Sequence, residues 1–165
     1  MTKKINISCE CNGNSKEETF LITVKDMQES QRNELRDLYL ISRKEAFYWL
    51  DSTGFKLTDF DNDTLGESVL VAVEYSKIVG FISIYLEDSF IHCLFVDPSK
   101  QGSGIGSLLL EEAKKRLNHQ MTLKCLSKNH SGLAFYLKRG WKVLDEVIFE
   151  NKNDNYLNLI YKITQ

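Results

Sequence analysis

The chain of 165 residues is poor in proline and has neither a long hydrophobic run nor an excess of charge of one sign. Pro98 is its only proline, so no proline-rich linker divides it, and we expect one domain over 1–165. No apolar stretch approaches the roughly 20 residues that span a membrane, so we expect no membrane partner. The formal net charge is −2, from 21 basic and 23 acidic residues, which predicts no nucleic-acid partner.

The four cysteines do not form a disulfide framework or a zinc site. Cys9 and Cys11 form a C-x-C pair, but no second pair completes a metal site, so we expect no metal. Cys93 and Cys125 lie in apolar strand-like runs, which favours packing, although a covalent route through either stays open. Polar and acidic residues follow the first residues, where a signal peptide would be apolar, and we expect a cytoplasmic protein.

A glycine-rich segment, Gln101-Gly102-Ser103-Gly104-Ile105-Gly106, is the most informative motif. It lies between a strand-like run over 90–96 and an amphipathic helix pattern over 105–117. Glycines let the backbone approach a ligand and point N–H groups at it, and the helix N-terminus adds partial positive charge. The segment therefore suits a phosphate or pyrophosphate. A dinucleotide fingerprint would need glycine where Ser107 stands, and a Walker A loop would need a Gly-Lys-Ser/Thr tripeptide.

Hydrophobic periodicity predicts an α/β fold with a mixed sheet and flanking helices. The predicted strands are 20–24, 68–74, 78–86, 90–96, 121–126, 142–149 and 156–163. Residues 1–18 form either an extra strand over 5–11, turning at Asn12-Gly13, or a loosely ordered extension. Asp26-Met27-Gln28-Glu29 is typical of a capping box and predicts the start of the first helix. That helix is lined by Leu35, Leu38, Tyr39, Ala46 and Phe47; a short helix within 51–66 and helices over 105–117 and 133–138 follow.

The order β-α-(α)-β-β-β-α-β-α-β-β and two motifs resemble the GNAT N-acetyltransferase superfamily from about residue 20 to 163. The first motif, 96–106, is similar to the family's Q/R-x-x-G-x-G/A loop. The second, 129–141, resembles N-x-x-A-x-x-x-Y-x-x-x-G-F, with Gly132 for the usual alanine and Trp141 for the usual phenylalanine. The resemblance implies a sheet that splays between its fourth and fifth strands, 90–96 and 121–126.

The resemblance also implies acetyl-CoA as co-substrate and direct transfer of its acetyl group to a primary amine, in a small molecule or a peptide. Leu94 and Val96 would pair their backbones with the pantetheine arm and present an N–H to the thioester oxygen. Asn129 would contact the pantetheine, and Tyr136 would act as general acid. The other implied cofactor-binding residues are Phe95, Gln101, Gly102, Ser103, Gly104, Ile105, Gly106, Ser107 and Ala134. We expect a monomer or homodimer.

Each candidate has a simpler interpretation. Tyr136 is either the acid or a packed helix residue. His92 is either a satisfied core histidine or the general base, as in arylalkylamine-type members; Phe90 stands where histone-type members carry a glutamate. Tyr39, Phe47, Tyr48 and Trp49 either border the acceptor site or anchor a helix, and the acidic run Asp59, Asp61, Asp63 and Glu67 either attracts a cationic amine or is a solvated loop.

Two other functions share this fold. The chain is either an enzyme or a non-catalytic module that binds acyl-CoA and regulates a partner, and a structural protein is the third alternative. Tyr136 and His92 favour the enzyme, because a binding module needs neither a proton donor nor a base.

Overall fold

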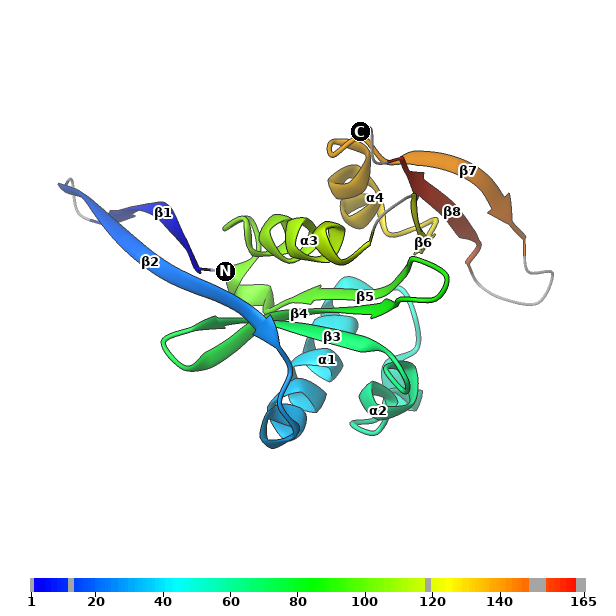
Figure 1. Ribbon diagram of the computed structural model, residues 1–165, viewed down its shortest axis with the longest axis horizontal. Helices are drawn as coiled ribbons and strands as arrows, with labels where there is room; N and C mark the ends of the chain where they lie inside the picture. Colours follow the sequence, from blue (N-terminus) through cyan, green and yellow to red (C-terminus); the bar gives the residue numbers. More distant parts are fainter. Residues whose placement is uncertain (1, 12–13, 118–119, 149–153, 163–165) are drawn as a thin grey trace.

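The computed structural model describes residues 2–11, 14–117, 120–148 and 154–162, with side chains from residue 21 onward (Figure 1). Within these residues eight strands form one sheet, in the order β1-β2-β3-β4-β5-β6-β8-β7. Neighbouring strands are antiparallel, except that β5 and β6 are parallel, and the predicted mixed sheet is confirmed. The strands are β1 (Thr2–Cys11), β2 (Asn14–Asp26), β3 (Ser68–Glu74), β4 (Lys77–Tyr85), β5 (Phe90–Val96), β6 (Met121–Leu126), β7 (Lys142–Val147) and β8 (Tyr156–Tyr161).

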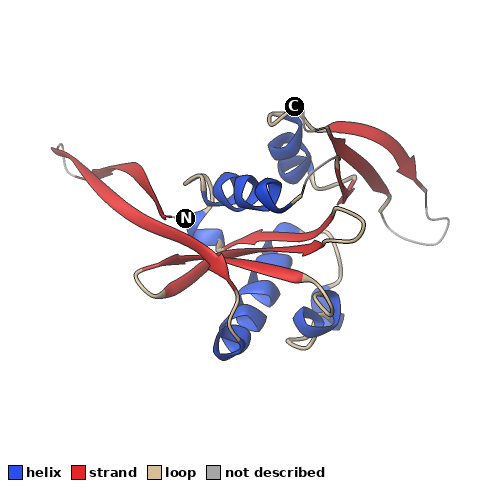
Figure 2. Ribbon diagram, viewed as in Figure 1, coloured by secondary structure: helices blue, strands red, loops and turns tan. Residues whose placement is uncertain are grey.

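The helices cover both faces of the sheet. Figure 2 shows α1 and α2 below the central strands, and α3 and α4 above them. Leu109 and Trp141 belong to the hydrophobic core under α3, whereas Leu35 and Phe81 belong to the core under α1. None of the helices in the described part of the chain is long and apolar enough to cross a membrane. The helices are α1 (Arg32–Ala46), α2 (Asp59–Asp63), α3 (Ile105–Arg116) and α4 (His130–Leu137).

The N-terminal residues form a hairpin rather than a loose extension. β1 pairs antiparallel with β2 from Thr2, opposite Thr23, to Cys11, opposite Asn14. β2 pairs with β3 only over 22–26, so most of the hairpin extends beyond the rest of the sheet (Figure 1). The predicted turn at Asn12-Gly13 lies outside the described residues, as do the predicted strand ends at 149 and 163.

The predicted capping box at Asp26 is wrong. Gln28 begins a short turn before α1, and its backbone N–H donates to Gln31 Oε1 at 2.9 Å. Asp26 is the last residue of β2, and its carboxylate accepts two hydrogen bonds from Arg116, at 2.7 and 2.9 Å. The carboxylate is therefore used to join β2 to the end of α3 instead of capping α1.

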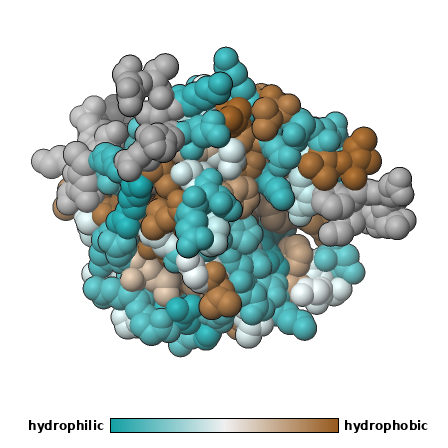
Figure 3. Space-filling model, turned by 45° about the vertical axis from the view of Figure 1, so that its right-hand side comes forward, coloured by the Kyte–Doolittle hydropathy of each residue, from teal (hydrophilic) through white to brown (hydrophobic). Residues whose placement is uncertain are grey.

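The end strand of the sheet carries exposed apolar side chains. Figure 3 shows a largely hydrophilic surface, with hydrophobic groups beside the grey residues at its right-hand side. β7 leads into those residues, and Leu144 and Ile148 are exposed to 62% and 71%. Neither side chain belongs to the two hydrophobic cores.

The parallel strands β5 and β6 separate after two residue pairs. Phe90 lies opposite Thr122 and Ile91 opposite Leu123, and no further pairing joins these two strands. The splay predicted between these strands is confirmed (Figure 1). Because β4 pairs with β5 as far as Val96, the separation leaves one edge of β5 without a neighbouring strand.

Candidate active site

A cavity of about 960 Å³ lies where β5 and β6 separate. Its walls come from β5 and the glycine loop, from α3 and α4, and from the second half of α1. These elements bring together most of the residues selected from the sequence. The selected residues that line the cavity are Tyr39, Phe47, His92, Leu94, Phe95, Val96, Gln101, Gly102, Gly104, Ile105, Gly106, Ser107, Asn129 and Tyr136.

Four selected residues do not line the cavity: Ser103, Ala134, Tyr48 and Trp49. Ser103 turns back within the loop, where its hydroxyl donates to the Lys100 carbonyl at 2.5 Å. Tyr48 is 81% exposed. The Trp49 indole N–H instead donates to the Asp154 carboxylate at 3.1 Å. The sequence alone does not show which residues of a motif line the cavity, because the side chains of adjacent residues point in different directions.

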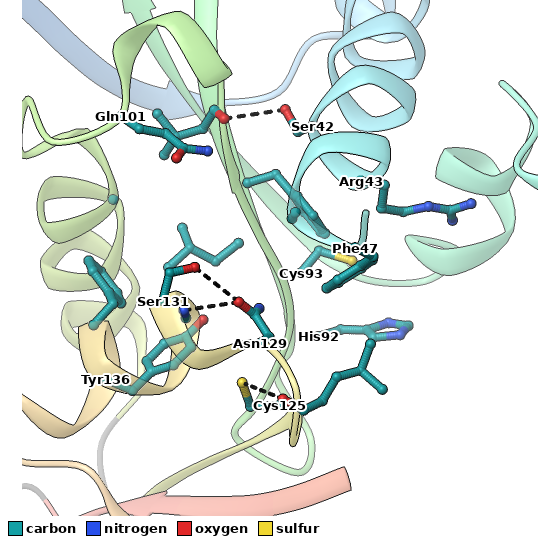
Figure 4. Close-up of a pocket in the computed structure, with 18 of the residues that line it drawn as sticks. Ser42, Arg43, Phe47, His92, Cys93, Gln101, Cys125, Asn129, Ser131 and Tyr136 are labelled. Carbon is teal, nitrogen blue, oxygen red and sulfur yellow. Dashed lines mark hydrogen bonds between the residues drawn. The ribbon is translucent and has the colours of Figure 1, made fainter. Parts of the chain in front are cut away.

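The open edge of β5 presents backbone groups to the cavity. The Asp97 N–H donates to Val79 in β4 at 2.9 Å, and backbone polar groups alternate between the two sides of a strand. The N–H and C=O groups of Leu94 and Val96 therefore point away from β4, toward the cavity. The Val96 carbonyl accepts a hydrogen bond from Ser42 Oγ at 3.3 Å, drawn in Figure 4. Leu94 thus offers a backbone donor and acceptor to a ligand.

Phe95 contributes its ring rather than its backbone. By the same alternation its N–H and C=O face β4, and a Cβ atom on Gly80 would lie 3.0 Å from the Phe95 carbonyl oxygen. Its ring packs against Tyr39 and Phe47, with centroids 5.0 and 6.0 Å apart. Phe95 therefore offers its ring, and not its backbone groups, to a ligand in the cavity.

A β-bulge places His92. In the pairing of β4 with β5, Ser83 lies opposite Cys93 and Ile84 opposite Ile91, so His92 is the extra residue. The bulge turns His92 to the side of β5 that faces α1, where Figure 4 shows it near Cys93. Simple alternation would have placed His92 with Leu94 on the side of α3, so its position was not predictable from the strand pattern.

His92 is bound by a carboxylate that the sequence analysis did not pair with it. Its Nδ1 lies 2.8 Å from Glu67 Oε1, and the Glu67 side chain is only 8% exposed. This hydrogen bond is the largest cause that raises the pKa of His92 above its ordinary value of 6.5; burial opposes it, and the charges of Glu67 and Asp63 add to it. The environment therefore favours a proton on this ring.

The glycine loop closes on the N-terminus of α3. Gly102 and Gly104 have φ angles of +78° and +87°, in the left-handed region that favours glycine. Gly104 is the N-cap of α3, so the free N–H groups of the first helical turn lie at the cavity wall. This geometry suits an anion.

Arg139 brings positive charge to the same wall. Its Nε donates to Ser107 Oγ at 3.1 Å and its Nη1 to the Phe135 carbonyl at 2.7 Å. Its guanidinium lies 3.7 Å from the centre of the Phe135 ring, and Arg139 lines the cavity. The sequence analysis missed this residue, although it directly precedes the glycine of the second motif.

Tyr136 lies across the cavity from His92, on the other side of β5 (Figure 4). Its ring packs against Phe135 and Trp141, with centroids 5.1 and 5.6 Å apart. Burial raises the pKa of its hydroxyl, so the phenol keeps its proton at neutral pH. Tyr136 is therefore packed at the cavity wall with its hydroxyl protonated, and packing does not exclude a role as proton donor.

Neither cysteine at the cavity is a good nucleophile. Burial raises the pKa of the Cys93 thiol to about 12 and that of the Cys125 thiol to about 11. Because the thiolate is the nucleophile, both groups are held in the unreactive form at neutral pH. This environment does not favour a covalent route through either cysteine.

The acidic run is paired rather than solvated. Asp61 accepts hydrogen bonds from Arg32 at 2.9 Å and from Arg36 at 2.8 Å. Asp59 accepts a hydrogen bond at 2.6 Å from Arg43. The interpretation of this run as a solvated loop is therefore wrong, because α1 neutralises two of its carboxylates.

Tyr39 and Asp63 form the wall of the cavity beside α1. The Tyr39 hydroxyl donates to Asp63 Oδ2 at 2.6 Å, and Arg43 Nη1 donates to the same atom at 3.4 Å. All three residues line the cavity. Together with His92, these three residues make this end of the cavity polar. Aromatic rings, among them that of Phe47, line the cavity beside them.

The family model for the acetyltransferase (GNAT) domain matches residues 55–154, which include β5, the glycine loop, α3 and α4. The chain belongs to the GNAT acetyltransferase family. By this membership it is an acetyltransferase, and the resemblance seen in its two motifs is confirmed.

Curated relatives and solved structures agree with this assignment. The chain is 34% identical over 110 residues to the peptidyl-lysine N-acetyltransferase YjaB of Salmonella typhimurium, which covers 64% of this chain and 74% of that protein. It is 33% identical to YjaB of Escherichia coli over the same length, covering 73% of that protein. The solution structure of apo-form YjaB from Escherichia coli has a TM-score of 0.68 and 26% identity, covering 85% of this chain and 97% of that one.

A more distant structure shows the same fold. The PaiA N-acetyltransferase of Thermoplasma acidophilum, solved in complex with coenzyme A, has a TM-score of 0.69 and 20% identity. It covers 86% of this chain and 99% of that one.

Proposed function

We propose that this acetyltransferase moves the acetyl group of acetyl-CoA to a primary amine, by direct transfer with both substrates bound, and that lysine side chains of peptides are its acceptors. The proposal rests on the open edge of β5, because this edge lies between His92 on one side and Tyr136 on the other. The name of the YjaB relatives, peptidyl-lysine N-acetyltransferase, supports the acceptor class.

The residues on the side of α3 fit acetyl-CoA. The first turn of α3 and the loop around Gly104 would hold the pyrophosphate through backbone N–H groups, and Arg139 adds a cation there. Leu94 would pair its backbone with the pantetheine arm, as one strand pairs with another, and Asn129 lies at the same wall. Bound there, acetyl-CoA supplies the activated acetyl group.

Three groups of this chain would serve the transfer. His92 takes the proton that the amine loses as its nitrogen bonds to the acetyl carbon. The Leu94 N–H donates to the thioester oxygen, which gains negative charge in the transition state. As the carbon–sulfur bond breaks, Tyr136 gives its proton to the departing sulfur. Each proton thus has a donor and an acceptor at the cavity.

The raised pKa of His92 sets the pH dependence. A base must be neutral, so kcat/KM should rise with pH through the His92 ionisation, which lies above 6.5. At lower pH the imidazolium predominates and the rate falls. The His92→Gln variant should lose this inflection, whereas a structural histidine would leave the profile unchanged.

Turnover of a lysine peptide tests the proposal, with coenzyme A release as the readout. Tyr136→Phe should lower kcat by roughly 100-fold, because general acid catalysis contributes on the order of 10²-fold or more. Its acetyl-CoA affinity by calorimetry should stay nearly unchanged. Full retention of kcat would refute the role of Tyr136. Binding of acetyl-CoA without coenzyme A release, across lysine peptides and small amines, would instead identify a non-catalytic binding module.

A further inference from the structure

Glu67 is a buried carboxylate that is only half satisfied. It lies directly before β3, and its side chain is 8% exposed. Oε1 lies 2.8 Å from His92 Nδ1, whereas Oε2 is buried and has no hydrogen-bond partner. A buried carboxylate oxygen without a partner costs free energy, so such a group needs an explanation.

Glu67 contacts the His92 ring from outside the cavity. His92 lines the cavity and 42% of its side chain is exposed, but Glu67 is not among the cavity-lining residues. The contact joins the segment before β3 to the bulge in β5, 25 residues apart along the chain. Glu67 therefore does not meet the acceptor amine, and any effect on the reaction passes through the ring of His92.

We infer that Glu67 is a positioning residue that holds the His92 ring with a proton on Nδ1, so that Nε2 carries the lone pair that accepts the proton of the attacking amine. An ionised carboxylate can only accept hydrogen bonds, so Nδ1 must donate to it. The neutral ring then has its acceptor at Nε2. This inference rests on the proposed function, in which His92 is the base.

The same contact stabilises the ring after it has taken the proton. As the N–H bond of the acceptor breaks, its proton moves to Nε2 and the ring becomes an imidazolium beside the Glu67 carboxylate. A carboxylate has this effect on histidine in hydrolytic triads, where it orients the ring and stabilises its charge without being protonated.

The other groups around His92 act less strongly. Asp63 favours the charged ring through its charge and its main chain, but its carboxylate is already bound by Tyr39 and Arg43. Burial raises the pKa values of both Tyr39 and Cys93, so these groups stay neutral. Among the described residues near the ring, the Glu67 carboxylate therefore dominates.

Glu67→Gln tests the inference because it keeps the size of the side chain and removes its charge. The His92 ionisation is followed by NMR in histidine-labelled protein, and His92→Gln assigns the signal. In wild type we expect His92 to titrate above 6.5 and its neutral form to carry the proton on Nδ1. In Glu67→Gln we expect it to titrate at or below about 6.5 and to lose that tautomer preference.

Kinetics give the second readout. In Glu67→Gln the inflection of kcat/KM should move to lower pH, and its plateau should fall about tenfold, which corresponds to about 1.4 kcal/mol. Acetyl-CoA affinity should not change. Asp61→Asn is the matched control, because it removes a carboxylate of the same run that binds arginines of α1, and it should leave both the His92 titration and the inflection unchanged.

The outcomes separate this inference from the proposed function. An unchanged His92 titration and tautomer in a folded Glu67→Gln protein would overturn the positioning role, even if the enzyme is fully active. A changed titration with an unmoved kcat/KM profile would overturn it as well. Full activity of His92→Gln would refute the proposed base itself, whatever the spectra of Glu67→Gln show.

Discussion

Replacing Gly132 by alanine sets two effects of similar size against each other. Gly132 lies in the first turn of α4, where alanine should stabilise the helix by up to about 1 kcal/mol. However, a Cβ atom on Gly132 would lie 2.5 Å from Nδ2 and 2.8 Å from Cγ of Asn129. The Asn129 side chain would have to move away, because these distances are much shorter than a van der Waals contact.

Moving Asn129 removes the N-cap of α4. Its Oδ1 accepts the hydrogen bond of the Gly132 N–H at 3.0 Å, and loss of such a cap costs about 1 kcal/mol. The two terms nearly cancel, so the free energy of unfolding should change by less than about 1 kcal/mol. For a chain of this size the melting temperature should then shift by no more than about 4 °C.

Acetyl-CoA binding should reveal the displacement of the Asn129 side chain, which the nearly unchanged free energy of unfolding does not. Asn129 lines the cavity beside the proposed pantetheine path, and one hydrogen bond contributes about 0.5–1.5 kcal/mol. Gly132→Ala should therefore weaken acetyl-CoA binding by roughly two- to tenfold in calorimetry.

A double-mutant cycle is the control. In an Asn129→Ala background there is no side chain to displace, so Gly132→Ala should stabilise the protein by up to about 1 kcal/mol. The same stabilisation in the wild-type background, with unchanged acetyl-CoA affinity, would refute the steric argument.

Three further substitutions test other parts of the site. Gly104→Asp places a side chain at a φ of +87° and a negative charge at the start of α3, so acetyl-CoA affinity in calorimetry should fall at least about tenfold. Gly80→Ala brings a Cβ atom within 3.0 Å of the Phe95 carbonyl oxygen, and denaturant unfolding should show a loss of about 1–3 kcal/mol. Trp49→Phe keeps a ring but loses the hydrogen bond to the buried Asp154 carboxylate, so denaturant unfolding should show a loss of about 0.5–1.5 kcal/mol at unchanged acetyl-CoA affinity.

The fold could be predicted because its signals are local. The apolar run within 68–74 and the glycines after β5 are patterns of neighbouring residues, and the structure places β3 and the start of α3 there. The sequence predicted the ends of the helices and strands less accurately than their existence. α4 begins at His130 rather than at Leu133, because Asn129 caps the helix and compensates for Gly132 in its first turn.

The environment of the proposed base could not be predicted in this way. His92 depends on a bulge, which breaks the alternation that sequence reasoning uses, and on Glu67, which reaches it from a separate segment. The acidic run shows that carboxylates gather in this segment, but no pattern in the sequence shows which carboxylate meets an arginine and which meets a histidine. Such pairings are set by how α1 packs on the sheet.

The separation of β5 from β6 accounts for the two sides of one strand in the proposed proton transfers. If the two strands paired along their full length, β6 would occupy the backbone groups of Leu94, and no donor would remain for a thioester oxygen. Because the edge is open, a substrate can complete the hydrogen bonds that the sheet leaves unmade. A substrate at this edge is accessible from both faces of the sheet, and the proposed base and acid lie one on each: His92 on the side of α1, through the bulge, and Tyr136 on α4. A substitution that closed the gap between β5 and β6 should therefore abolish acetyl-CoA binding while it stabilises the sheet.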